Sequence, residues 1–306
     1  MPEKSPEQRV SDGTAWSEFC DTLKMAGQTV LRASTPDDPL TRAEGYRYLS
    51  RLTRTALEAF IERADPRAPV LHRPVHETVK MGSDNPDIYY EFATLDGQYE
   101  YRLRGTRGTV HHLVFGTYVG TYGMGGRAGQ TGHLEGADLE VADDGSFTVS
   151  LSRARRPGNW LPMQEDSSSL IVRQMFLDRH SERRAELTLE RVGGDGLPTP
   201  LTPAGFESAL GVASRFVLGC SAMFANWVEG FMRHANELPQ FDPAVSLAAH
   251  GDPNIVYYHS YWRLAPDEAL VIEVTPPPCD TWNFQLNNHW MESLDYRYYK
   301  IWVNKG

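Results

Sequence analysis

The spacing of apolar residues changes near Pro74, and this change constrains the fold of the 306-residue chain more than any other feature. Before Pro74, apolar side chains recur at helical spacing. After it, as far as residue 191, they alternate in short runs separated by turn residues. Helices therefore do not alternate with strands, which argues against a parallel α/β fold. The pattern predicts a mainly β fold with flanking helices, of the α+β class.

Three segments carry helical periodicity. The first covers residues 14–31, and the second begins at Asp38-Pro39, an N-cap followed by proline at the first helical position. The second segment ends at Asp65-Pro66. The third and longest helix begins at Thr202-Pro203 and keeps a broad apolar side as far as Phe231. Each helix has an apolar face that must pack against another element.

Two Asp-Gly pairs punctuate the β-rich part of the chain. Asp96-Gly97 separates the alternating runs 87–95 and 98–104, and Asp144-Gly145 separates 138–142 from 147–151. This arrangement predicts two β-hairpins. Further strands are expected at residues 109–119, 168–176, 187–191, 255–262, 269–274, 282–286 and 296–303. Short strands joined by tight turns indicate an antiparallel β-sandwich or jelly-roll-like core.

The changes of pattern divide the chain into five parts. A flexible tail (1–13) precedes an N-terminal helical segment (14–66) and a first β region (67–191). A linker (192–201) then leads to the long helix and a second β region (202–306).

Composition limits the compartment and the partners of the protein. The net charge of −10 argues against a nucleic-acid partner, which usually requires a basic face. The most apolar stretch, 210–231, contains Arg215 and Glu229, so we do not expect it to span a membrane. The N-terminus lacks the apolar run of a signal peptide. Three scattered cysteines, Cys20, Cys220 and Cys279, fit a reducing compartment. We therefore expect a soluble cytoplasmic protein.

No motif in the chain predicts a cofactor or a metal. Residues 123–128 match the glycine spacing of a dinucleotide-binding loop, but more glycines follow where that loop requires a helix. We expect a loop between strands there, acting as a pocket lid. The adjacent His111 and His112 point to opposite faces of a strand, and no zinc motif or nucleophile elbow occurs. We predict neither a metal nor a cofactor.

Two clusters combine polar groups with aromatic side chains, one near residues 157–179 and one at 282–290. Amides beside tryptophans suit a neutral polar ligand, but a buried structural amide network has the same pattern. The ligand-binding candidates are Asn159, Trp160, Arg179, Asn283, Gln285, Asn288 and Trp290. No catalytic set is identified, and the candidates for chemistry are Asp178, His259 and Arg173.

Four segments, in this order, resemble proteins that carry the domain of unknown function 1214. They are residues 101–108, 158–161, 173–179 and 264–293, and the resemblance covers most of residues 40–304. It implies a β-sandwich-like fold, joined in some longer proteins to the related 1254 domain, and it implies no established reaction. Members of that family continue beyond the segment that matches 298–305 here. The chain stops at Gly306, so we expect an unpaired strand edge that favours oligomerisation.

Two functions are compatible with these observations. The first, slightly favoured, is an enzyme such as a hydrolase, acting on a small neutral organic or sugar-like substrate between the β region and the long helix. The second is a non-catalytic ligand-binding or assembly module in which the same residues are structural. Chemistry requires a titratable group in a concave pocket beside the amides, and this feature separates the two functions.

Overall fold

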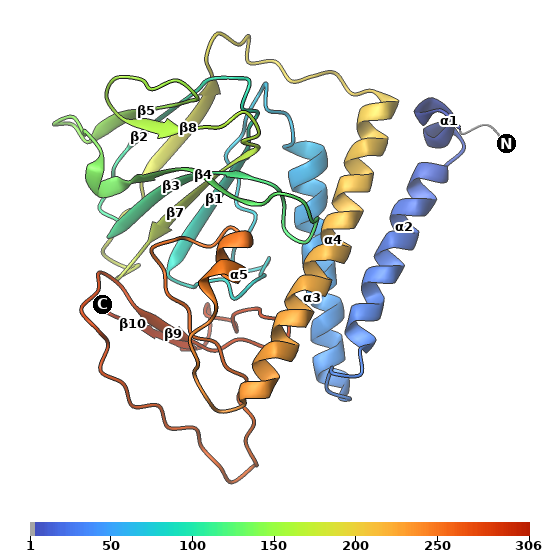
Figure 1. The fold of residues 1–306 in the computed structure, drawn as a ribbon, viewed down its shortest axis with the longest axis vertical. Coiled ribbons are helices and arrows are strands. Elements are labelled where there is room, and N and C mark those ends of the chain that lie inside the picture. The colour runs from blue at the N-terminus through green and yellow to red at the C-terminus, as the bar shows by residue number, and fades with distance from the viewer. Residues whose placement is uncertain (1–3) are drawn as a thin grey trace.

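The computed structural model describes residues 4–306 and has an α+β fold with two four-stranded sheets and a layer of helices (Figure 1). The helices are α1 (Pro6–Ser11), α2 (Thr14–Gly27), α3 (Pro39–Leu57), α4 (Pro203–Phe231) and α5 (Pro243–Ala248). The strands are β1 (Ile88–Thr94), β2 (Tyr101–Thr106), β3 (His112–Val119), β4 (Gly129–Glu135), β5 (Ser146–Ser152), β6 (Trp160–Pro162), β7 (Ser169–Met175), β8 (Glu186–Arg191), β9 (Asn283–Gln285) and β10 (Trp302–Asn304). Four short helical turns are η1 (Gln28–Leu31), η2 (Glu58–Glu62), η3 (Gly136–Asp138) and η4 (Met232–His234).

The two large sheets form the predicted β-sandwich. One sheet has the strand order β1-β7-β3-β4 and the other β6-β5-β2-β8, with all neighbours antiparallel except β5 and β6. Phe147, Val149 and Leu151 alternate inward as expected, and they share one apolar core with Phe115 and Val172 of the opposite sheet. The sandwich is therefore closed by alternating side chains contributed by both sheets.

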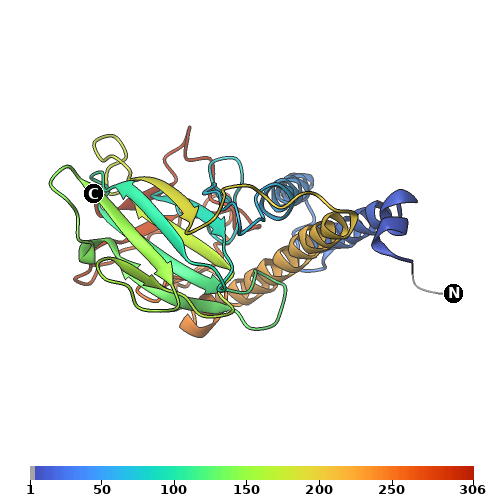
Figure 2. The same ribbon diagram turned by 90° about the horizontal axis from the view of Figure 1, so that it is seen from above.

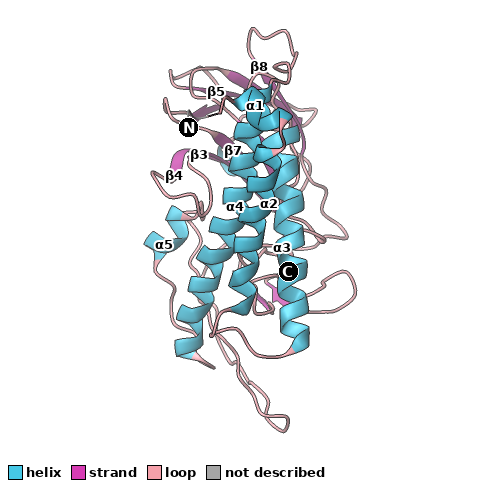
Figure 3. Cartoon of the chain, turned by 90° about the vertical axis from the view of Figure 1, so that its right-hand side faces the viewer, coloured by secondary structure: helices cyan, strands magenta, loops and turns pink. Residues whose placement is uncertain are grey.

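Helices α2, α3 and α4 lie side by side on one side of the sandwich (Figures 2 and 3). Both predicted N-caps are confirmed, because Asp38 accepts a hydrogen bond from the backbone of Thr41 (2.9 Å) and Thr202 accepts one from Gly205 (3.1 Å). Residues 203–234 are long and apolar enough to cross a membrane, yet 44% of the most apolar window is buried within the protein. Since the core helix of a soluble protein passes the same test, this is weak evidence for a membrane span.

Neither Asp-Gly pair forms the predicted hairpin. Strand β1 pairs with β7, whereas β2 pairs with β5 and β8, so Asp96-Gly97 carries the chain from one sheet to the other. Gly97 allows the backbone to pack closely against Gln164, because an added Cβ would lie 2.2 Å from the carbonyl oxygen of Gln164. Gly145 does make a tight turn at φ 82°, but residues 139–142 form no strand before it. A local turn signal does not determine which strand becomes the hydrogen-bonded partner.

Two segments expected to lack regular structure possess it. Within the predicted tail, α1 is stabilised by a capping box between Ser5 and Gln8. Gly129–Glu135, read as part of a loop, forms the edge strand β4 beside β3. Edge strands need only one partner, so a glycine-rich sequence is tolerated there.

The second β region is mostly irregular, which corrects the prediction of four strands. Residues 255–262 and 269–274 form no strand, and the last two predicted strands shrink to β9 and β10. The apolar side chains of Val271 and Val274 are 77% and 75% exposed. Their alternation resembles that of a strand, but no described segment pairs with them. In Figure 1 this part of the chain extends as a long loop at the bottom of the molecule.

Trp290 anchors the C-terminal segment to the helical layer. Its ring is 4% exposed, stacks near Tyr48 (6.3 Å between centroids) and donates a hydrogen bond from Nε1 to the carbonyl of Thr41 (2.8 Å). Helix α3 accommodates the ring at Gly45, where an added Cβ would lie 2.5 Å from Cζ2 of Trp290. A single buried aromatic side chain therefore joins two regions that are 245 positions apart in the sequence.

We predict that Trp290→Ala lowers the free energy of unfolding by about 3–5 kcal/mol, because it leaves a cavity in the helical core. Urea unfolding followed by circular dichroism measures the change. Trp262→Ala is the matched control, since Trp262 is 52% exposed and its removal should cost less than about 0.5 kcal/mol. Equal effects of the two substitutions would contradict the anchoring role.

Candidate functional site

Asn159 and Trp160, two of the predicted ligand-binding residues, form hydrogen bonds at one edge of the sandwich. The Asn159 amide donates to the carbonyls of Glu140 (2.9 Å) and Thr148 (3.1 Å) and accepts from the backbone of Glu140 (2.8 Å). Nε1 of Trp160 donates to Ser152. All these partners lie in or beside β5, so both side chains have the contacts of structural residues.

Asp178 and Arg179 have separate partners. Asp178 is exposed and closes a turn, accepting hydrogen bonds from the backbone of His180 (2.9 Å) and the hydroxyl of Ser181 (2.6 Å). The hydrogen bond from Ser181 lowers the pKa of Asp178 most, and the one from His180 lowers it further. Nε of Arg179 donates to the carbonyl of Pro86 (2.7 Å). An exposed carboxylate of low pKa is poorly suited to general acid–base chemistry at neutral pH.

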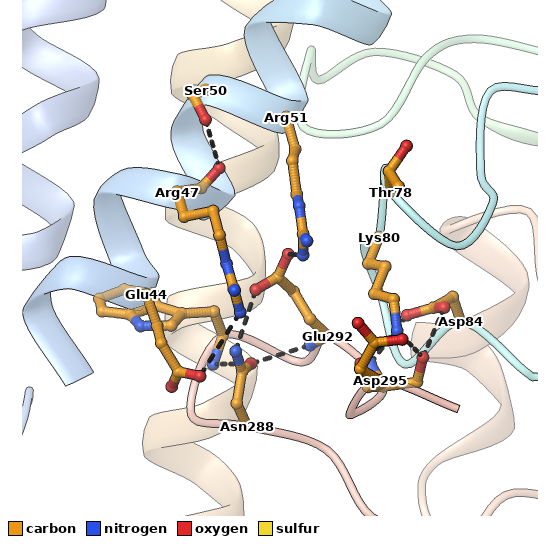
Figure 4. A network of polar contacts seen from close by, with 12 residues as sticks. Glu44, Arg47, Ser50, Arg51, Thr78, Lys80, Asp84, Asn288, Glu292 and Asp295 are labelled. Carbon is orange, nitrogen blue, oxygen red and sulfur yellow. Dashed lines mark hydrogen bonds and ion pairs between the residues drawn. The ribbon is translucent and has the colours of Figure 1, made fainter. Parts of the chain in front are cut away.

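Asn283 and Gln285 lie on strand β9, whereas Asn288 lies in the turn that follows it. Gln285 donates to the carbonyl of Asp84 (3.0 Å) and accepts from Asn283 (3.1 Å). Asn288 donates to Glu292 (2.9 Å) and accepts from the backbone of Trp290 (3.0 Å). The contact between Asn288 and Glu292 can be followed in Figure 4.

A buried network that the sequence analysis missed fixes the same turn (Figure 4). The ammonium of Lys80 donates to the carbonyl and hydroxyl of Ser293 (2.6 and 2.9 Å) and to the carbonyl of Leu294 (2.9 Å). Ser293 in turn donates from its hydroxyl and backbone to Asp84 (2.8 and 2.9 Å). Because all three ammonium hydrogens are engaged, Lys80 cannot act as a base toward Ser293. In the sequence, this network is indicated only by a lysine that stands between two apolar residues, Val79 and Met81.

Arg173 has a different environment from the other candidates. It lies on β7, on the sheet face opposite the sandwich core, and is 8% exposed. Its Nη1 donates to the hydroxyl of Tyr118 (2.8 Å), and its Nη2 donates to the carbonyl of His250 (2.5 Å). Tyr90 of β1 is its cross-strand neighbour. The arginine is thus surrounded by neutral oxygen atoms and aromatic rings.

Gly116 makes this arrangement possible. It lies on β3, and a Cβ there would come within 2.6 Å of Cε2 of Tyr118. The missing side chain lets the Tyr118 ring lie across the strand so that its hydroxyl reaches Arg173. Gln130 of β4 donates to the same hydroxyl (3.3 Å). A glycine inside a strand marks such a close approach, and this was the signal available in the sequence.

The loop 120–128 and the segment around His250 cover this face. The ring of Tyr122 packs against His250 (4.9 Å) and near Phe224 of α4 (6.5 Å). Gly123 meets Gly219 of α4 so closely that an added Cβ would lie 2.2 Å from the backbone of Gly219. The loop therefore packs between His250, which accepts a hydrogen bond from Arg173, and helix α4. We call Arg173, Tyr90, Tyr118, Tyr122, His250 and Tyr257 the Arg173 layer.

Four ionisable groups of the Arg173 layer, Tyr90, Tyr122, Tyr257 and His250, are neutral near pH 7. Burial raises the pKa of Tyr90, Tyr122 and Tyr257, and burial lowers the pKa of His250. These three tyrosines stay partly exposed, so the layer reaches solvent. Nε2 of His250 lies 3.1 Å from the carbonyl of Val119, which fixes the hydrogen on Nε2. No residue in 4–306 forms a hydrogen bond with Nδ1, which is left as an acceptor.

The remaining histidines do not join this layer as a metal site. His112 and His133 contact Glu135 (3.3 and 2.7 Å), but within residues 4–306 no three His, Cys, Asp or Glu side chains are arranged to hold a metal ion. Two open surface depressions, of ≈ 480 and ≈ 650 Å³, lie beside β8 and between α2 and α3. Neither is lined by a predicted site residue.

His259, a candidate for chemistry, is packed among aromatic rings. It stacks on Phe231 (4.7 Å, 13° between planes) and meets the edge of Phe241 (4.9 Å). Burial lowers its pKa to about 4. Its one link to the Arg173 layer is the stacked ring of Tyr257 (5.9 Å).

This low pKa predicts a loss of stability in mild acid. The unfolded chain binds the proton with a pKa of about 6.5, so the free energy of unfolding should fall by about 1–3 kcal/mol as the pH drops from 6.5 to 4. Unfolding in urea across this range measures the slope. His259→Phe keeps the stacking and should flatten this part of the slope, whereas His111→Gln at an exposed position should not. An unchanged slope in His259→Phe would contradict the burial of a neutral imidazole.

Comparisons with known proteins identify a relative but no activity. A scan against models of protein families gives no match, and a search of curated proteins also gives none. The crystal structure of an uncharacterized protein from Burkholderia cenocepacia is 49% identical, with a TM-score of 0.92 over 97% of this chain and 83% of that chain. The VPA0106 protein from Vibrio parahaemolyticus is 16% identical over 52% of this chain and 47% of that chain, and its TM-score of 0.27 supports no inference. This chain belongs to the same family as the Burkholderia cenocepacia protein.

Proposed function

We propose that this protein binds a small oxygen-bearing organic molecule in the Arg173 layer, between the sheet β1-β7-β3-β4 and helix α4. One observation carries the proposal. Arg173 and the Tyr118 ring are buried on a sheet face beneath the loop 120–128 and the segment around His250, where apolar side chains would be expected. Convergent polar groups among aromatic rings are typical of small-molecule sites. The proposal uses the same region that the sequence suggested, between the β region and the long helix, and of the predicted residues it uses only Arg173.

Catalysis is a second candidate function, and His250 is the observation that favours it. Its neutral imidazole presents Nδ1 as an acceptor close to Tyr118 and Tyr122 (5.0 and 4.9 Å between ring centroids). A neutral imidazole with a free nitrogen can accept a proton from a bound hydroxyl or water. Hydrolysis of a small organic substrate is the reaction class that we propose for this alternative.

Family, compartment and assembly complete the proposal. The four ordered sequence segments support membership of the family with the domain of unknown function 1214. The acidic charge and the sparse cysteines support a cytoplasmic protein without a nucleic-acid or membrane partner. The exposed apolar side chains of residues 256–303 support a homo-oligomer.

Untargeted extraction tests the binding site. We expect wild-type protein purified from cells to retain a small molecule, detected by mass spectrometry after denaturation. Arg173→Met should reduce the retained amount at least tenfold, because it removes the only buried cation of the layer. Arg153→Met, at an exposed position, is the matched control and should retain the molecule. Circular dichroism verifies folding. A wild-type protein without a retained molecule, or equal retention by all three proteins, would contradict the proposal.

A further inference from the structure

We infer that the ligand of the Arg173 layer is a carboxylate attached to an apolar body, an inference that rests on the function proposed above. The first argument is the missing counter-ion. No Asp or Glu among the described residues lies within ion-pair distance, 4.0 Å, of the Arg173 guanidinium. Its two hydrogen-bond acceptors are the hydroxyl of Tyr118 and a backbone carbonyl, and neither is a carboxylate.

The groups nearby do not form an ion pair with Arg173. Asp252 is 3% exposed and attracts Arg173 from beyond ion-pair distance, and its Oδ1 accepts from the backbone of Asn254 (2.9 Å). The partly exposed tyrosines keep their protons because burial raises their pKa, and His250 is neutral. A buried cation without a directly paired anion is destabilising. A bound anion would reduce this cost.

The Arg173 guanidinium also has N–H donors that take no part in these two hydrogen bonds. Arginine carries five N–H groups in a fixed plane, and two are engaged with Tyr118 and His250. The remaining donors match the two oxygens of a carboxylate, which arginine binds in a bidentate manner.

The walls of the layer select what is attached to the carboxylate. The ring centroid of His250 lies 5.0 Å from that of Tyr118 and 4.9 Å from that of Tyr122, and Tyr90 and Tyr257 are partly exposed. Aromatic walls favour an apolar body through packing and exclusion of water. A free inorganic anion would use Arg173 but leave these walls without a contact. The combination therefore favours an organic carboxylate over phosphate.

Three probes of similar size or charge test the inference by isothermal titration calorimetry at pH 7. Benzoate carries a carboxylate on an apolar ring, benzamide is its neutral isostere, and inorganic phosphate is an anion without an apolar body. We expect benzoate to bind wild-type protein at least tenfold more tightly than either of the others. Arg173→Met should abolish benzoate binding, and Arg153→Met should leave it unchanged.

A second variant keeps the inference testable if Arg173→Met does not fold. Arg173→Lys keeps the positive charge but loses the planar fork, so benzoate should bind more weakly than to wild type and still more tightly than benzamide. Benzamide binding as tightly as benzoate, phosphate matching benzoate, or no binding of benzoate would each overturn the carboxylate inference. The extraction experiment stands apart from these outcomes. A retained neutral molecule would refute the carboxylate and keep the site, whereas an empty wild-type protein would refute the site.

Discussion

The central strands β3 and β7 are buried on both faces, and the arrangement of the molecule follows from this constraint. Their inner face packs against the second sheet in an apolar core. Their outer face lies under the loop 120–128 and the segment around His250, but carries Arg173 and Tyr118. Such a face is stable only if covered polar groups find partners. The hydroxyl of Tyr118 and the carbonyl of His250 accept two of the hydrogen bonds that the arginine can donate.

The C-terminal segment is held in another way, by side chains and not by a sheet. Trp290 enters the helical core beside Gly45, and Lys80 and Asp84 fix the turn at Ser293. Both attachments are buried and fully hydrogen-bonded, so a segment with little regular structure acquires a defined position. This also explains the pattern of asparagines and tryptophans near residue 288. Its residues serve the attachment, although the same pattern would suit a ligand pocket.

The sequence predicted the elements whose signals are local. The N-caps at Asp38 and Thr202 and the inward alternation of Phe147 and Val149 act over a few residues, and all are found. The prediction of a hairpin at Asp96-Gly97 was wrong because packing across the sandwich decides which strand is the partner. The Arg173 layer could be anticipated only in part. Its members come from three strands and two covering segments, and their proximity depends on the register of β3 against β7.

A carboxylate could reach Arg173 while the arginine keeps its present partners. Arg173 donates to Tyr118, which lies on a strand, and to the carbonyl of His250, which lies in a covering segment. These two hydrogen bonds hold the guanidinium plane, and the remaining donors are left for the two carboxylate oxygens. The water lost from these groups would offset part of the attraction, so the net free energy of binding would be smaller than that of the new ion pair alone. For this reason the affinity for a carboxylate should depend on how firmly Tyr118 and His250 hold the arginine, as well as on the guanidinium itself.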